Sequence, residues 1–247
     1  MNKRLRMCLE DWPVALLAGG LATRLRPLTE KIPKALVKVA DEPFLAHQLR
    51  LLRAQGIRQV ILCLGYLGEM IEGQFGDGAA YGMNIEYSFD GPQLLGTGGA
   101  LIRALPALGD RFFVIYGDSY LPTNYAKVAQ AFLGCGKPAM MTVFKNRDRW
   151  DTSNVEFDGK EILRYDKTNR DKTMQYIDYG LNVFRREALA NCPSDKPFDL
   201  AQFYPDLIIK NQLAGFEVKE RFYEVGSSRG LTELNSLLRR SAAPAQS

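Results

Sequence analysis

Histidine and cysteine, two side chains that often carry nucleophilic and acid–base catalysis, are scarce in this chain of 247 residues. The single histidine, His47, falls in a predicted helix. Ser-His-Asp, Cys-His and H-E-x-x-H chemistries are therefore either absent or depend on that one residue. The cysteines are far apart and form no C-x-x-C pair, which argues against a zinc site or a disulfide framework and for a reducing compartment. There are four: Cys8, Cys63, Cys135 and Cys192.

Long apolar runs and dense clusters of one charge are also absent. No segment approaches the roughly 18 consecutive apolar residues of a membrane span. The apolar stretch near the start is interrupted by Glu10 and Asp11, unlike a signal peptide. The net charge is +4, and the basic residues mostly alternate with acidic ones, whereas nucleic-acid binding would need a denser basic stripe. We therefore expect a cytoplasmic protein with neither nucleic acid nor a membrane among its partners; its oligomeric state is left open.

The length and the 46% apolar content suit one large α/β domain with a substantial core. Apolar runs predict strands at 13–17, 57–64 and 111–116, and an alternating pattern predicts one at 84–89. Helical patterns lie between them, beginning near 44, 67 and 96. Such alternation with short connections predicts a doubly wound, mostly parallel (Rossmann-like) sheet with helices on both faces and ligands at the carboxyl ends of the strands.

The second half of the chain is richer in short strands, which predict a small antiparallel portion built on the same sheet. A turn at Asp158-Gly159 separates two of these strands. Two further helices are expected, the first of them kinked or broken at Pro205. The predicted strands are 138–144, 150–157, 161–165, 176–184, 213–218 and 222–226, and the helices are 199–210 and 227–240.

The stretch around which the chain is organised is LAGGLATRLRPLTEKIPKALVKV, residues 17–39. Gly19-Gly20 follows the first predicted strand, where the backbone can turn and approach a ligand closely. The fixed cations Arg24, Arg26, Lys31 and Lys34 come next, as a polyphosphate requires. No Walker A string occurs. The string at 96–99 begins like a dinucleotide fingerprint but has leucine at 101 where the last glycine should be.

This stretch closely resembles the signature of the sugar-1-phosphate nucleotidyltransferases, L-A-G-G-x-G-T-R-L-x-P-L-T-x-x-x-P-K-x-L, with Ala22 where the family usually has glycine. The resemblance implies that the first strand end and the later L-G-T-G-G string hold the nucleotide. The alternative for that string is a glycine-rich turn with Thr97 as an ordinary helix N-cap. The implied nucleotide-binding residues are Leu17, Ala18, Gly19, Gly20, Thr23, Gly96, Thr97 and Gly98.

Two carboxylates are candidates for holding Mg²⁺, the cofactor that the resemblance implies. Asp118 follows a predicted strand and Gly117, so it could reach a metal that bridges phosphates or could merely form a turn. The resemblance favours the metal role. Glu224 stands where relatives typically carry an aspartate as second ligand.

The resemblance also implies which residues bind the sugar 1-phosphate. Asp166 and Lys167 stand where relatives carry an acidic residue and a lysine that grip the sugar and its phosphate; Lys167 could otherwise be a surface lysine. Asp178 and Gly180 match a strand of the family in which asparagine is common at the first position. We therefore expect a single domain, 1–247, with a nucleotide-binding half at 13–135, a sugar-phosphate-binding half at 136–240 and a frayed tail at 241–247.

The implied reaction is attack of a sugar 1-phosphate on the α-phosphorus of a nucleoside triphosphate, with release of pyrophosphate. The attacking phosphate is already an anion near neutral pH, so no general base is needed. Arg24, Lys34 and Asp118 are the predicted catalytic residues. The L-G-T-G-G-A string favours GTP, because it looks most like guanylyltransferases of mannose- or heptose-type sugars. Alternatives are a uridylyl- or cytidylyltransferase with a different phosphorylated acceptor, and a non-catalytic nucleotide-sugar-binding regulatory protein.

Overall fold

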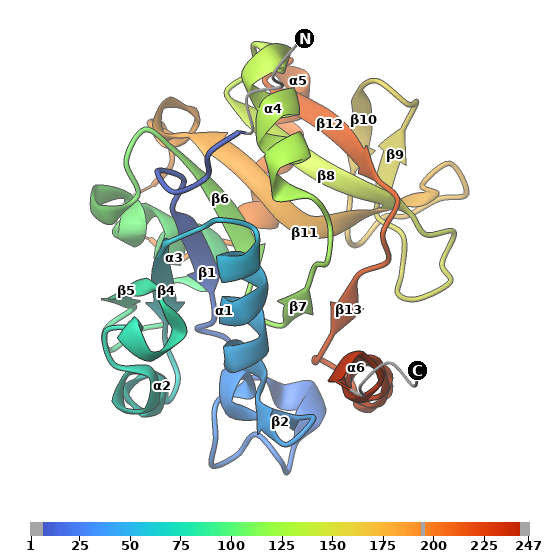
Figure 1. Cartoon of the computed structure of the whole chain (residues 1–247). Coiled ribbons are helices and arrows are strands. Elements are labelled where there is room, and N and C mark those ends of the chain that lie inside the picture. The colour runs from blue at the N-terminus through green and yellow to red at the C-terminus, as the bar shows by residue number, and fades with distance from the viewer. Residues whose placement is uncertain (1–6, 194–195, 243–247) are drawn as a thin grey trace, which may run out of the picture.

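The computed structural model describes residues 7–193 and 196–242 (Figure 1). Its centre is a nine-stranded mixed sheet with the order β10-β9-β11-β6-β1-β4-β5, and β8 and β12 extend it beyond β11. The parallel part consists of β1 (Val14–Leu17), β4 (Gln59–Leu64), β5 (Asn84–Phe89) and β6 (Arg111–Tyr116).

The antiparallel part begins at β11 (Tyr176–Arg185), which runs against β6 on one side and against β8 (Ala139–Lys145) on the other. β12 (Leu213–Val218) is parallel to β8. β9 (Val155–Phe157) and β10 (Ile162–Tyr165) form a hairpin at the end of the sheet. This arrangement confirms the predicted fold class, a mostly parallel sheet with a smaller antiparallel portion.

Helices cover both faces of this sheet because successive strand residues point to opposite sides. In β1, Val14 and Leu16 belong to one apolar core, and Ala15 and Leu17 to the other. The first core receives α1 (Phe44–Ala54), α2 (Gly68–Phe75) and α4 (Tyr125–Cys135). The second receives α3 (Gly96–Ala104) and α5 (Tyr204–Ile209).

Two small ribbons and the last helix lie outside the main sheet. β2 (Lys38–Val39) pairs with β3 (Glu42–Pro43), and β7 (Ser119–Tyr120) pairs with β13 (Tyr223–Glu224). The final helix, α6 (Ser228–Ala242), packs on these ribbons through a third cluster of Val39, Phe44, Val225 and Leu234. Of the tail predicted at 241–247, residues 241 and 242 continue α6, and 243–247 lie outside the described residues.

Two secondary-structure predictions need correction. The segment 199–210 is not one kinked helix: a 3₁₀ turn at Leu200–Gln202 precedes α5, and Pro205 lies in the first turn of α5, where its missing N–H removes no hydrogen bond. The strand predicted at 150–157 begins only at Val155, because the preceding residues form a loop tied by side-chain hydrogen bonds of Asn146 and Ser153. None of the helices in the described part of the chain is both long enough and apolar enough to span a bilayer.

Candidate active site

A cleft of about 440 Å³ lies along the carboxyl ends of the parallel strands. One end is built by the strand ends of β1, β4 and β5 together with the start of α3, and the other by β11 and the loops beside β9 and β10. The residues after β6 lie between these ends, as the strand order requires. The predicted site residues that line the cleft are Leu17, Ala18, Gly19, Gly20, Arg24, Lys34, Gly96, Thr97, Asp118, Lys167, Asp178, Gly180 and Glu224.

Three predicted residues are not part of this lining: Thr23, Gly98 and Asp166. Thr23 begins a 3₁₀ turn in the loop after β1. The residue before it, Ala22, has a φ of 51°, in the left-handed region that favours glycine. Its carbonyl accepts a hydrogen bond of 2.7 Å from the Thr29 hydroxyl. This backbone conformation gives a physical reason for glycine at that position in the family signature.

The loops after β1, β4 and β6 pack so closely that glycine is required where they meet. A Cβ atom on Gly65 would lie 2.6 Å from the Gly19 carbonyl oxygen, and one on Gly117 would lie 2.6 Å from the Leu17 carbonyl oxygen. Gly20 has no neighbouring atom within 4 Å of its would-be Cβ. The strand ends are therefore locked together, while the backbone at Gly20 stays accessible to a ligand.

The centre of the cleft holds Lys34 and Asp118, whose Nζ and Oδ2 atoms are 3.0 Å apart. The ribbon of β7 and β13 brings Glu224 beside them, since Glu224 pairs with Ser119 and the Val225 N–H donates to the Asp118 carbonyl at 2.9 Å. Asp118 and Glu224 are distant in sequence, and the ribbon places them together.

Gly226 marks the point at which the predicted catalytic and metal groups converge. A Cβ atom at this position would lie 2.7 Å from Glu224 Oε2, 3.0 Å from Arg24 Nη2 and 3.2 Å from Asp118 Oδ2. Any larger residue would fill the space that the two carboxylates and the guanidinium share. A site of this composition can bind a phosphate chain and a divalent cation together.

The longer side chain of Glu224 is accommodated by helix α6. Its carboxylate accepts hydrogen bonds from the Gly226 N–H and the Ser227 hydroxyl. A Cβ on Gly230 would lie only 1.9 Å from Glu224 Oε1, so glycine at 230 makes room for the carboxylate. Gly226 and Ser227, which lead into α6, thus hold Glu224 in place beside Asp118, and Gly230 in the first turn of α6 leaves room for it.

Among the described residues, no group of three or more His, Cys, Asp or Glu side chains is placed to hold a metal ion. Magnesium in phosphate-transferring sites is commonly bound by one or two carboxylates, with phosphate oxygens and water completing its coordination. Asp118 and Glu224, which face the same point near Gly226, provide such a pair. The donor set therefore fits Mg²⁺ that is bound together with a triphosphate.

The start of α3 is occupied by a segment from the second half of the chain. The Phe198 carbonyl accepts hydrogen bonds from the Gly98 N–H at 3.0 Å and the Gly99 N–H at 3.4 Å. A Cβ on Gly98 would lie 2.1 Å from the Phe198 ring. Gly98 therefore packs against Phe198 in this structure, whereas Gly96 and Thr97 reach the cleft.

Thr97 is not the N-cap of this helix. The helix begins at Gly96, with Leu95 before it. The Thr97 hydroxyl donates to Asp199 Oδ1 at 3.1 Å and accepts from the Leu200 N–H at 2.8 Å. The threonine therefore connects the nucleotide-binding half to the segment that precedes α5.

Asp178 lies at the other end of the cleft within a hydrogen-bond network. Its Oδ1 accepts from the Gly180 N–H at 3.0 Å and Asn182 Nδ2 at 3.3 Å, and its Oδ2 accepts from the Tyr116 hydroxyl at 3.2 Å. Burial raises the pKa of Asp178, and the hydrogen bonds and the charge of Lys167 partly oppose that rise. Asp178 thus presents a desolvated acceptor to the cleft.

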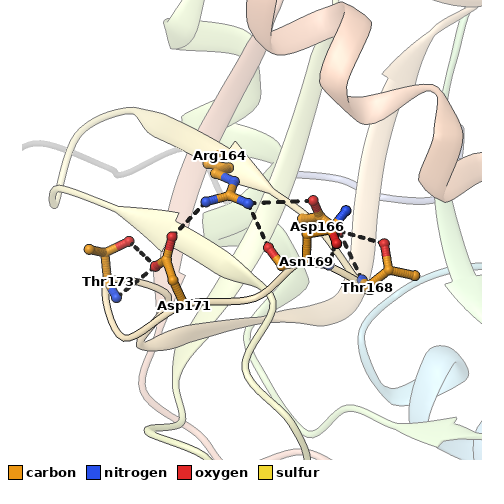
Figure 2. Close-up of polar contacts among 6 residues, drawn as sticks. All are labelled: Arg164, Asp166, Thr168, Asn169, Asp171 and Thr173. Atoms are coloured by element: carbon orange, nitrogen blue, oxygen red, sulfur yellow. Dashed lines mark hydrogen bonds and ion pairs between the residues drawn. The ribbon is translucent and has the colours of Figure 1, made fainter.

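Asp166 shapes the loop that carries Lys167. Figure 2 shows its carboxylate folded back onto the residues that follow it, with Arg164 between Asp166 and Asp171. The Asn169 N–H and the Thr168 N–H and hydroxyl donate to Oδ1 at 2.8 to 2.9 Å, and these bonds lower the pKa of Asp166 to about 2. Lys167 itself lines the cleft, with its Nζ 4.0 Å from Asp199 Oδ1.

Comparison with known proteins identifies the family to which the chain belongs. The model of the family described as Nucleotidyl transferase matches residues 14–240, which is most of the chain. The chain belongs to the nucleotidyl transferase family. This confirms the resemblance inferred from the residue 17–39 stretch.

Individual relatives of this nucleotidyl transferase differ in the base they are named for. It is 41% identical over 116 residues to an N-acetylmuramate alpha-1-phosphate uridylyltransferase of Neisseria meningitidis; the match covers 47% of the chain and 50% of the relative, so it spans half of that protein. It is 30% identical over 176 residues to a D-glycero-alpha-D-manno-heptose 1-phosphate guanylyltransferase of Campylobacter jejuni, covering 71% of each. The solved structure of HddC from Yersinia pseudotuberculosis with GMP-PN shares the fold, at a TM-score of 0.76, 24% identity and coverage of 92% and 99%.

Sequence reasoning missed several residues that line the cleft of this nucleotidyl transferase: Asp90, Tyr116, Asp151 and Asn154. Asp90 follows β5 just as Asp118 follows β6, so its position at a strand end was the available signal. It is 5% exposed, and its Oδ1 has no hydrogen-bond partner among the described residues. Asn154, whose Oδ1 accepts from the Asp178 N–H at 3.0 Å, lies in a loop without periodicity and had no comparable signal.

Proposed function

We propose that this chain is a sugar-1-phosphate nucleotidyltransferase, which joins a nucleoside triphosphate and a sugar 1-phosphate and releases pyrophosphate. The observation that carries the proposal is the convergence of Arg24, Asp118 and Glu224 on one point at Gly226, with Lys34 paired to Asp118. This cluster lies between a glycine-rich end and an acidic, hydrogen-bonding end of one cleft.

The residues of the cleft would act mainly by position and charge. The sugar phosphate is an anion near neutral pH and can attack the α-phosphorus in line without a general base. Arg24 would stabilise the pyrophosphate leaving group, and Lys34 would bridge the α-phosphate and the incoming phosphate. Mg²⁺ held by Asp118 and Glu224 would neutralise the negative charge that develops on the phosphates. Lys167 would seat the phosphate of the sugar.

We favour GTP as the nucleotide. The L-G-T-G-G-A string supports this choice, and so does the heptose 1-phosphate guanylyltransferase that covers most of the chain. The relative that is 41% identical over 116 residues is named a uridylyltransferase, and UTP or CTP with another phosphorylated acceptor is the alternative. We also propose a cytoplasmic location, in keeping with four free cysteines.

A second candidate, a non-catalytic nucleotide-sugar-binding regulator, would keep the cleft but not the chemistry. The presence of Arg24, Lys34, Asp118 and Glu224 in one cluster favours catalysis over this reading. A regulator would bind a nucleotide sugar without magnesium-dependent turnover.

The deciding experiment measures pyrophosphate release with Mg²⁺, testing GTP, UTP, CTP, ATP and dTTP against a panel of hexose and heptose 1-phosphates. We expect release only when one triphosphate and one sugar phosphate are present together, and no release in the presence of a chelator. An Asp118→Asn variant serves as the matched inactive protein. Nucleotide-sugar binding without release for any pair would replace the enzyme with the regulator.

A further inference from the structure

The end of the cleft beside β11 carries two carboxylates and one cation, Lys167, whose charge acts on Asp178. Asp178 and Asp151 both line the cleft, and neither forms an ion pair with any described residue. Asp178 is held from the strand β11, and Asp151 from the loop that precedes β9. A substrate at this end therefore meets fixed negative charge.

The hydrogen bonds of Asp178 show what kind of further partner its carboxylate can bind. Its Oδ1 already accepts from the Gly180 N–H and Asn182 Nδ2, and its Oδ2 accepts, among the residues that the structure describes, from the Tyr116 hydroxyl alone. All three partners donate, which suits a charged carboxylate. The remaining acceptor capacity lies on Oδ2 and suits one more donor, such as a sugar hydroxyl or amino group.

Asp151 adds to this charge from the loop that precedes β9. Its Oδ1 accepts from the Thr152 N–H at 2.6 Å, and its carbonyl accepts from Asn146 Nδ2 at 2.5 Å. The loop is further tied by Ser153, which is 2% exposed and bonds to Asp148 and Asn146. The loop that carries Asp151 is thus held in place, and the exposed carboxylate of Asp151 accepts from the N–H of the residue that follows it.

The positive charges of the cleft are needed elsewhere. The cationic residues in its lining are Arg24, Lys34 and Lys167. Arg24 and Lys34 lie at the central carboxylates, and Lys167 is assigned to the phosphate of the sugar. A carboxylate on the sugar ring would find no cation of its own and would lie near Asp178 and Asp151, where like charges repel at short range.

We infer that the sugar subsite selects a sugar 1-phosphate whose ring substituents are neutral or cationic donors and rejects sugar acids, with Asp178 and Asp151 as the specificity-determining residues. This inference rests on the proposed function, and it adds a substrate class to it. The selection works by leaving a sugar carboxylate unpaired beside fixed negative charge rather than by the shape of the cleft.

The test uses pairs of substrates that differ at one group. Glucose, galactose and mannose 1-phosphates are compared with the corresponding uronic acid 1-phosphates, and N-acetylglucosamine 1-phosphate with N-acetylmuramate 1-phosphate, each with the preferred triphosphate. We expect kcat/KM for the neutral member to exceed that for the acidic member by at least about tenfold. Equal rates, or faster turnover of an acid, would overturn the inference while leaving the proposed function intact. Absence of turnover with every sugar would instead remove the proposed function.

Charge-removing variants then assign the selection to the two residues. In Asp178→Asn the amide oxygen can keep the bonds from Gly180 and Asn182, and the amide nitrogen can donate to the Tyr116 oxygen. We expect the neutral-to-acid ratio to fall at least about fivefold in Asp178→Asn and in Asp151→Asn. Asp206→Asn, on the exposed side of α5, is the control and should leave the ratio unchanged. An unchanged ratio in Asp151→Asn would contradict the assignment even if Asp178→Asn did not fold.

Discussion

Lys34 is the residue whose removal most directly tests the chemistry. Its ammonium is 3.0 Å from Asp118 Oδ2 in the centre of the cleft. We expect Lys34→Ala to lower kcat/KM roughly 10²- to 10³-fold, because an electrostatic contact to the reacting phosphates is lost. The pair is partly exposed, so the unfolding free energy should change by less than about 1 kcal/mol.

Lys31 supplies the matched control for this prediction. The sequence pattern groups it with the phosphate-binding cations of the loop, but the structure shows Lys31 exposed and outside the cleft lining. Lys31→Ala should therefore keep nearly wild-type pyrophosphate release in the same assay. Retention of most activity by Lys34→Ala would refute the catalytic role, and an equal loss in both variants would point to damage of the loop instead.

A pH titration tests the structural role of Asp166 in the loop that carries Lys167. Its pKa is lowered to about 2 by hydrogen bonds from Asn169 and Thr168. A carboxylate whose folded pKa lies below its unfolded value near 4 stabilises the folded loop above pH 4, and that contribution is lost as the pH falls through about 2. Carboxyl NMR shifts should place the Asp166 midpoint near pH 2. Thr168→Val removes the hydroxyl donor and should raise this midpoint. A wild-type midpoint near pH 4 would show that Asp166 does not form these hydrogen bonds.

The residues of the site could be predicted from the sequence where a motif follows the end of a predicted strand. Gly19, Asp118 and Gly180 follow from such positions, because parallel strands bring their carboxyl ends to one edge. The partners of Phe198 were not predictable, since the contact of its carbonyl with Gly98 joins segments about a hundred residues apart. The motif alone predicts a nucleotide contact for Gly98, whereas its packing against Phe198 depends on that distant segment.

At the scale of elements, the packing of Phe198 against α3 gives the sharpest stability prediction. A Cβ on Gly98 would lie 2.1 Å from the ring, so Gly98→Ala should destabilise the protein by roughly 1–3 kcal/mol through overpacking. This loss comes in spite of the higher helix propensity of alanine. Chemical denaturation followed by circular dichroism measures it.

Gly134 in α4 is the control for that substitution, because nothing lies within 4 Å of its would-be Cβ. Gly134→Ala should stabilise the protein by up to about 1 kcal/mol. Adding Phe198→Leu to Gly98→Ala should recover part of the loss, since the two positions share one contact. If Gly98→Ala changed the unfolding free energy as Gly134→Ala does, the contact of Phe198 with α3 would be refuted.

The strands were easier to predict than the helices, because their patterns stop at polar or glycine residues. Strands 84–89, 111–116 and 213–218 have the predicted bounds: the first alternates polar and apolar residues up to Asp90, the second is an apolar run that ends at Gly117, and the third ends before Lys219. Helix α4 was missed although Asn124 caps it and its buried positions are three and four residues apart. β13 lies within the strand predicted at 222–226, whereas the two-residue strand β7 was not predicted, so the pairing that brings Glu224 to Asp118 could not be read from the sequence.

At the scale of the whole molecule, the two predicted halves share their cores. The cluster on one face of the sheet joins Val60 with Ile177 and Val218, and the cluster on the other face joins Ile61 with Val143 and Tyr204. Neither half of the chain can therefore bury its apolar surface alone. We predict that 13–135 and 136–240 unfold together as one cooperative unit.

The two tryptophans allow each half to be observed separately. Trp12 is 1% exposed and packs on Phe113 and Phe132 in the first half, whereas Trp150 stacks with Arg221 in the second. In Trp12→Phe only Trp150 fluoresces, and in Trp150→Phe only Trp12 does. Within each variant the urea midpoint from fluorescence should equal the midpoint from far-UV circular dichroism, since both probes follow one transition. Separate midpoints would show that the halves unfold independently, and the shared cores would then contribute less to stability than their burial implies.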